Sequence, residues 1–210
     1  METTTPFASI ARIHALLDDW RELGSRTLPD GVELMGCQEN DCAENWLHVV
    51  HPGLSTQALN AFERRLRLRL PRDLRALYRR SSGMTLWGGA FIVYGYHDKS
   101  PLHTQTGFRP GDALRLNHEL EVLGWKPANA FAFAENAWDM TVHVVGMAHN
   151  PTVVQRCDRV TGAVLEEHKS VWTCIADRLS RIDNLMIAEP GADAGQQYSN
   201  AQTTTPVTET

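Results

Sequence analysis

The stretch from Leu54 to Tyr96 constrains the fold most, because its local signals follow one another in a definite order. Ser55 can cap a first helix by accepting a hydrogen bond from the backbone N–H groups of the opening turn. Apolar residues then recur at steps of three and four residues, which places them on one face of that helix. These residues are Leu59, Phe62, Leu66 and Leu70.

Pro71 separates this helix from a second one. It lacks a backbone N–H and its ring clashes with a preceding helical turn, but it fits at the first position of a new helix. The second helix is expected to run from Pro71 to about Arg80 and to end before Gly83, burying Leu74, Leu77 and Tyr78. The apolar run Ala90–Tyr94 is short and rich in β-branched and aromatic residues, which predicts a buried strand.

This order of elements resembles the SUKH superfamily, which contains the fungal Smi/Knr cell-wall-assembly regulators and many bacterial immunity proteins. The resemblance covers roughly residues 53–186, and Ser82 departs from it, because the family usually has Asn or a similar polar residue before the glycine. The resemblance implies a protein that acts by binding other proteins. The residues that carry it are Leu59, Phe62, Glu63, Leu66, Leu70, Pro71, Asp73, Leu74, Leu77, Tyr78 and Gly83.

The charge of the chain is unevenly distributed. The net charge is −5, yet residues 54–82 hold eight arginines against Glu63 and Asp73, a local charge of +6. Residues 28–53 hold five acids and neither Lys nor Arg. Such a separation can steer charged partners of either sign. The arginines are either the solvated face of the helix pair or a nucleic-acid-binding surface; they are Arg64, Arg65, Arg67, Arg69, Arg72, Arg75, Arg79 and Arg80.

Three segments are expected. Residues 1–52 form an acidic extension with a helix over Phe7–Leu23, whose apolar stripe includes Ile10, Ile13, Leu17 and Trp20. Val32–Met35 and Trp46–Val50 are interpreted as edge strands. Residues 53–188 form the SUKH-like domain. Residues 189–210 carry three acids, no bases and a single aromatic residue, so they are expected to be disordered.

The rest of the SUKH-like domain shows alternating helix and strand signals. Asp112 can cap a helix to about Leu123 that buries Ala113, Leu116, Leu120 and Leu123. Strands are expected over Phe131–Ala134, with a turn at Glu135–Asn136, and over Met140–Met147, where alternation places His143 on the outer side. A hairpin turning at residues 158–162 and a closing helix from Ser170 complete an α+β domain with a mixed or mostly antiparallel sheet packed against helices.

One cluster has the composition of a metal site. Cys37, Cys42, His48 and His51 make a C-x4-C-x5-H-x2-H series. Zinc accepts two cysteines and two histidines, but common fingers separate the two pairs by about a dozen residues. We therefore interpret the cluster as accidental and expect neither metal nor cofactor.

The chain shows no catalytic or nucleotide-binding motif, and we expect no enzyme activity. His97, Asp98 and His103 share a loop without a neighbouring nucleophile, and Cys157 and Cys174 are interpreted as buried, inert thiols. The N-terminus has neither a basic start nor an apolar segment, so no secretory signal is expected and a cytoplasmic location is predicted.

The resemblance predicts a bacterial immunity protein that blocks a cognate toxin by stoichiometric occlusion. If that toxin is a nuclease, acidic side chains could occupy its positively charged substrate groove. Exposed aromatic and acidic residues near strand ends are the best interface anchors. The candidate partner-binding residues are Trp87, Tyr94, Tyr96, Glu135, Trp138 and Asp139.

Three alternatives stay open at this point. The first is a regulatory scaffold like the fungal members of the superfamily. The second is nucleic-acid binding through the arginine-rich helices, which the negative net charge makes less favourable. The third is a zinc-dependent hydrolase that uses the cluster from Cys37 to His51.

Overall fold

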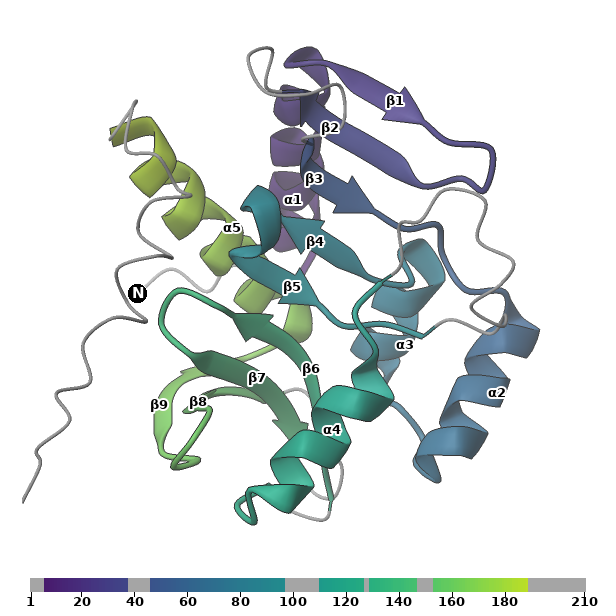
Figure 1. Ribbon diagram of the computed structural model, residues 1–210, viewed down its shortest axis with the longest axis vertical. Coiled ribbons are helices and arrows are strands. Elements are labelled where there is room, and N and C mark those ends of the chain that lie inside the picture. Colours follow the sequence, from purple (N-terminus) through teal and green to yellow (C-terminus); the bar gives the residue numbers. More distant parts are fainter. Residues whose placement is uncertain (1–5, 38–45, 97–109, 127–128, 147–152, 189–210) are drawn as a thin grey trace, which may run out of the picture. The chain divides into compact units, whose positions relative to one another are not determined.

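The computed structural model describes residues 6–37, 46–96, 110–126, 129–146 and 153–188 (Figure 1). The helices are α1 (Pro6–Glu22), α2 (Thr56–Leu66), α3 (Arg72–Arg80), η1 (Trp87–Gly89, a short 3-10 helix), α4 (Ala113–Val122) and α5 (Val171–Ala188). The strands are β1 (Ser25–Thr27), β2 (Glu33–Cys37), β3 (Trp46–Val50), β4 (Met84–Leu86), β5 (Phe91–Val93), β6 (Ala130–Asn136), β7 (Thr141–Gly146), β8 (Val154–Asp158) and β9 (Val164–His168).

The nine strands form one sheet in which spatial order follows chain order, from β1 to β9. Every ladder between neighbouring strands is antiparallel. Helices pack against this sheet, and Figure 1 shows α4 lying across β6 and β7. The expected α+β class, with an antiparallel sheet packed against helices, is confirmed.

The sheet continues across residue 52, where the sequence suggested a domain boundary. Val49 pairs with Thr85 and Val50 with Met84, so β3 and β4 are direct neighbours. The prediction that Val32–Met35 and Trp46–Val50 are edge strands is wrong, because β2 and β3 each have a neighbour on both sides. The terminal strand is β1, a polar three-residue strand whose side chains are all exposed.

The N-terminal helix α1 joins this part of the sheet through an aromatic contact. Ile13, Leu17 and Trp20 are buried, as the apolar stripe predicts, whereas Leu23 lies beyond the helix and is exposed. The Trp20 ring stacks on His48 of β3, with ring centroids 3.7 Å apart. The helix is therefore anchored to the sheet by its one tryptophan.

The helix pair α2–α3 follows the sequence prediction closely. The Ser55 hydroxyl accepts a hydrogen bond from the Ala58 N–H and caps α2. Pro71 is the N-cap of α3, one residue before the first helical position that was expected for it. Leu59, Phe62, Leu74, Leu77 and Tyr78 are buried.

A close backbone crossing follows α3. The Tyr96 N–H donates to the Ser82 carbonyl, and a Cβ on Gly95 would lie 1.4 Å from that oxygen. Only glycine fits at residue 95. The crossing joins the residues before β4 to those after β5, and only β5 was expected from the sequence.

The helix α4 covers one face of the second half of the sheet. Asp112 caps it by accepting from the N–H groups of Leu114 and Arg115, as predicted. Leu123 follows the helix and is exposed, against the expectation that it packs inward. The core under α4 consists of Leu116, Leu120, Ala130, Ala132, Val142, Val144 and Cys157.

Two details of strands β6 and β7 differ from the sequence prediction. The turn expected at Glu135–Asn136 is part of β6, since Glu135 pairs with Ile92 and Val142, and the turn follows at residues 137–140. His143 is fully buried instead of facing outward. Its ring lies against Phe91 and Phe133. His143 is buried because side chains on both faces of β7 are buried at this point.

The C-terminal hairpin β8–β9 and the start of α5 are as expected. Gly162 takes a left-handed φ of 72° in the hairpin turn, and Ser170 caps α5 by accepting from the Thr173 N–H. The chain divides into two compact units, residues 1–176 and 177–210; in the second, the described residues are the C-terminal part of α5. The tail expected to be disordered, residues 189–210, lies outside the described residues, and none of the described helices has the length and apolar character of a membrane span.

Candidate protein interface and basic pocket

The predicted partner-binding residues divide into buried and exposed groups. Trp87, Tyr96 and Glu135 are buried, with exposed fractions of 6%, 5% and 8%, so the expectation that they are exposed is wrong. Tyr94 is half-buried, whereas Trp138 and Asp139 are exposed. Within this set, Trp138 and Asp139 are therefore the residues placed to meet a partner directly.

Two of the buried residues have packing roles. Trp87 contacts Trp20 and His48 edge-on, at centroid distances of 4.9 and 5.3 Å. Tyr96 stacks on Phe62, with centroids 4.7 Å apart. Both tryptophan and tyrosine contribute large buried areas in such positions, so these two side chains hold the core together.

Tyr94 and Glu135, predicted separately, meet on neighbouring strands. The Tyr94 hydroxyl donates to Glu135 Oε2 at 3.2 Å. Arg159, from the β8–β9 turn, donates to Glu135 at 2.6 Å and to Glu119 of α4 at 2.9 Å. Burial and the negative charge of Glu135 raise the pKa of Tyr94 to about 12. The group thus works as a clamp that fixes the β8–β9 turn onto α4 and β6.

A second arginine fixes the β6–β7 turn. Arg156 of β8 contacts Asp139 at 3.3 Å and Glu166 of β9 at 3.2 Å. The Thr141 hydroxyl also donates to Asp139. In each clamp one guanidinium lies between two carboxylates. The Arg156 clamp keeps a negative formal charge, whereas Glu119 of the Arg159 clamp also pairs with Arg115, which makes that clamp neutral.

Exposed apolar side chains lie on the chain segments next to these two clamps. The Met140 carbonyl accepts from the Arg159 N–H, which places the β6–β7 and β8–β9 turns side by side. Trp125, just beyond α4, donates its indole N–H to the Arg159 carbonyl. Among the described residues, seven of the eight large exposed apolar side chains lie on these adjoining segments, with Val164 and Leu165 on opposite faces of β9. We call them the Trp138 surface: Val122, Leu123, Trp138, Met140, Val160, Val164 and Leu165.

The sequence prediction missed most of this surface. Val160, Val164 and Leu165 belong to the predicted hairpin. The alternation of apolar and polar residues does not predict that these apolar side chains are exposed. The available signal was that Val160 stands inside a polar turn sequence, Asp158–Gly162. Their common location depends on the pairing of β7 with β8, which the sequence alone does not supply.

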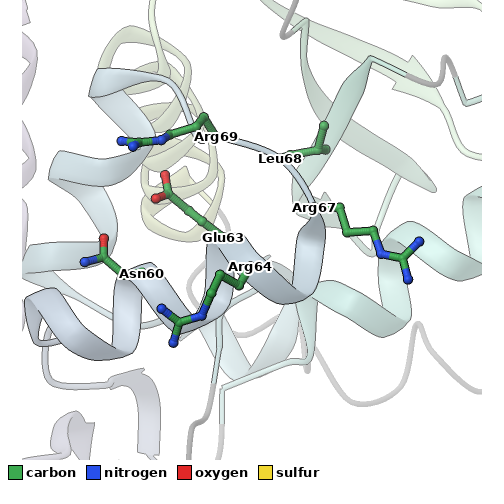
Figure 2. Close-up of a pocket in the computed structure, with 6 residues that line it drawn as sticks. All are labelled: Asn60, Glu63, Arg64, Arg67, Leu68 and Arg69. Carbon is green, nitrogen blue, oxygen red and sulfur yellow. The ribbon is translucent and has the colours of Figure 1, made fainter.

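A second candidate site is a basic pocket beside α2. It has a volume of about 430 Å³ and is lined by Asn60, Glu63, Arg64, Arg67, Leu68 and Arg69. The Glu63 carboxylate accepts from the Leu70 N–H and pairs with Arg75 of α3. Figure 2 shows Arg64 and Arg69 extending to the same side of the chain as Asn60 and Glu63, with Arg67 directed the other way.

The candidate metal-ligating and thiol residues do not form an accessible site within the described part of the chain. Cys42, His97, Asp98 and His103 lie outside the described residues, and within the described ranges no group of three metal-ligating side chains is assembled. His48 and His51 are both buried. Cys157 and Cys174 are buried as predicted, and the Cys174 thiol lies 3.1 Å from His143 Nδ1 in the core. A reactive thiolate requires solvent access, which this pair does not have.

A scan against protein-family models found no match for this chain, and a search of curated protein sequences found none either.

Proposed function

We propose that this protein is a non-catalytic, cytoplasmic binding protein of the immunity type, which blocks a cognate protein toxin by covering its active site. The observation that carries the proposal is the Trp138 surface, where seven of eight large exposed apolar side chains among the described residues lie on adjoining segments. Large exposed apolar patches on a protein of this kind indicate an interaction site. The resemblance to the SUKH superfamily supports the same function.

The chemistry of this surface matches that of protein interfaces. Interface energy usually concentrates in a few aromatic or arginine side chains surrounded by polar residues that exclude water. Trp138 is such an aromatic residue, exposed by 42%. The neighbouring Asp139 and Glu166 share the single cation of Arg156, so this side of the surface carries excess negative charge. An acidic rim favours association with the positively charged substrate groove of a nuclease toxin.

A pull-down with matched variants tests this function. Full-length protein, Trp138→Ala and Leu23→Ala are used as baits in lysate of the source organism. Leu23 is the appropriate control, because it is a large apolar side chain exposed by 62% that lies outside the Trp138 surface. A toxin-like partner is expected with the wild type and Leu23→Ala baits, and strongly reduced with Trp138→Ala.

The captured partner must then be purified and assayed. One molar equivalent of the wild-type protein is expected to abolish its activity, whereas Trp138→Ala requires a large excess. A set of signalling proteins that do not lose activity on binding would instead support a regulatory scaffold. Equal capture by all three baits would exclude the Trp138 surface as the binding site.

A further inference from the structure

We propose that the basic pocket beside α2 is a binding site for a compact polyphosphate anion, a small molecule with two or more linked phosphoryl groups. This inference does not depend on the proposed toxin-binding function, because it concerns different residues and a different ligand. It starts from the arginines of the pocket, which lack the carboxylate partners that Arg156 and Arg159 have.

Three guanidinium groups of this pocket have no internal counter-charge. Arg64, Arg67 and Arg69 are exposed, and their side chains form no hydrogen bond or ion pair with another described residue. The one carboxylate of the pocket, Glu63, is balanced by Arg75 and by the Leu70 N–H. Positive charge therefore exceeds negative charge in the pocket and is available to a ligand.

The backbone that carries these arginines is fixed. Arg67 ends α2 in a left-handed conformation, with φ of 53°, and its N–H donates to the Arg64 carbonyl. The Leu68 N–H donates to the Glu63 carbonyl, and the Leu70 N–H to the Glu63 side chain. These bonds fix the backbone beside the pocket, so binding an anion requires ordering of the arginine side chains but not of the main chain.

The number and direction of the cations indicate the class of ligand. Arg64 and Arg69 extend to one side with Asn60, whereas Arg67 extends to the other (Figure 2). A single small anion cannot contact all three, but a chain of phosphoryl groups offers charged oxygens along its length. Guanidinium forks bind phosphate oxygens in pairs, which suits arginine better than lysine for this purpose.

The size and lining of the pocket favour a small molecule over a nucleic acid. A volume of about 430 Å³ lies within the range of small-molecule pockets. None of the six lining residues is aromatic, so the pocket offers no ring on which a base can stack. The phosphate groups, and not a base, are therefore the part of the ligand that this pocket recognises.

Titration calorimetry with sodium triphosphate tests the site. The full chain is expected to bind one equivalent at about 0.1 M salt, where charges more than about 10 Å apart are largely screened. The double variant Arg64→Gln/Arg69→Gln is expected to weaken binding about thirtyfold or more, since each lost charge-assisted contact costs roughly three- to a hundredfold. Arg69→Lys keeps the charge but loses the planar fork, and an intermediate loss is expected.

The matched control is Arg72→Gln/Arg79→Gln. It removes the same charge from exposed arginines of α3 that do not line the pocket. Salt screens charges at this range, so a loss below about threefold is expected. Urea unfolding of both double variants is expected to match the wild type, because these side chains have no partner among the described residues.

Three outcomes would overturn the proposal. The first is no binding of triphosphate by the wild type at millimolar concentration. The second is an equal loss in the two double variants, which would indicate a diffuse basic surface. The third is tighter, steeply salt-dependent binding of a twelve-nucleotide oligothymidylate than of triphosphate, which would assign the arginines to nucleic acid.

Discussion

Arginines lie both beside the Trp138 surface and in the basic pocket, but they have opposite roles in the two places. Arg156 and Arg159 each lie between two carboxylates and hold two turns in place. Arg64, Arg67 and Arg69 have no carboxylate partner within the described part of the chain. An arginine therefore has a structural role where carboxylates surround it, and it is available to a ligand where they are absent.

Among the charged residues, the largest expected effect comes from breaking the Arg159 clamp. Arg159→Met should lower the free energy of unfolding by about 3 kcal/mol, because Glu119 and the buried Glu135 lose the cation between them. Urea denaturation measures this change. The control, Arg79→Met, removes an exposed arginine and should change stability by less than about 0.5 kcal/mol. Similar losses in both variants would contradict the contrast between paired and unpaired arginines.

His48 extends the comparison to a side chain that becomes a cation only in acid. Burial lowers its pKa from 6.5 to about 3, so the folded protein holds it neutral at pH values where the unfolded chain is protonated. Stability should be unaffected by His48 above about pH 6.5 and should fall by about 1.4 kcal/mol per pH unit between pH 6 and 4.

The control for this pH dependence is His48→Phe, which keeps a ring stacked on Trp20 and cannot titrate. Thermal unfolding across the pH range should show a flatter acid limb for this variant than for the wild type. If the two acid limbs coincide, the titration of His48 does not contribute to acid unfolding.

A smaller effect is expected inside the basic pocket. Glu63→Gln should cost about 1 kcal/mol, because the ion pair with Arg75 is lost while the amide oxygen can still accept from the Leu70 N–H. The same change removes the negative charge of the pocket, so triphosphate affinity should rise several-fold in calorimetry. A fall in affinity would mean that Glu63 positions the arginines that bind the anion.

The smallest expected effect concerns the centre of the Trp138 surface. Trp138 is exposed by 42%, so Trp138→Ala should change the free energy of unfolding by no more than about 0.5 kcal/mol. Trp87→Ala is the comparison variant, because Trp87 is buried against Trp20 and His48. Its removal should lower the free energy of unfolding by about 3–5 kcal/mol. Equal losses in urea would mean that Trp138 is structural.

The sequence predicted best those features that depend on neighbouring residues. The caps at Ser55 and Asp112 depend on side chains two or three residues from the groups they bind. The apolar stripe of α2 and α3 likewise needs only helical spacing. These parts of the fold were predictable because their causes lie within a few residues.

The features that the sequence failed to predict depend on contacts between strands that are distant in the chain. Glu135 remains in β6 because Ile92 and Val142 pair with it and Arg159 balances its charge, although its local sequence suggests a turn. His143 is buried because both faces of β7 are covered. The alternation of apolar and polar residues therefore does not predict which side chains of β7 are exposed. The Trp138 surface was found only in part for the same reason, since its members meet through tertiary pairing.

The chain order of the sheet also has a consequence for folding kinetics. The hairpins β6–β7 and β8–β9 close over short turns, at residues 137–140 and 159–163. Two other pairings must join distant parts of the chain: Val50 meets Met84 across the whole of α2 and α3, and Val93 meets Ala134 across α4. Closing a loop costs entropy that grows with its length, and local contacts form fastest. The hairpins are therefore expected to form early, and the joints β3–β4 and β5–β6 to limit the folding rate.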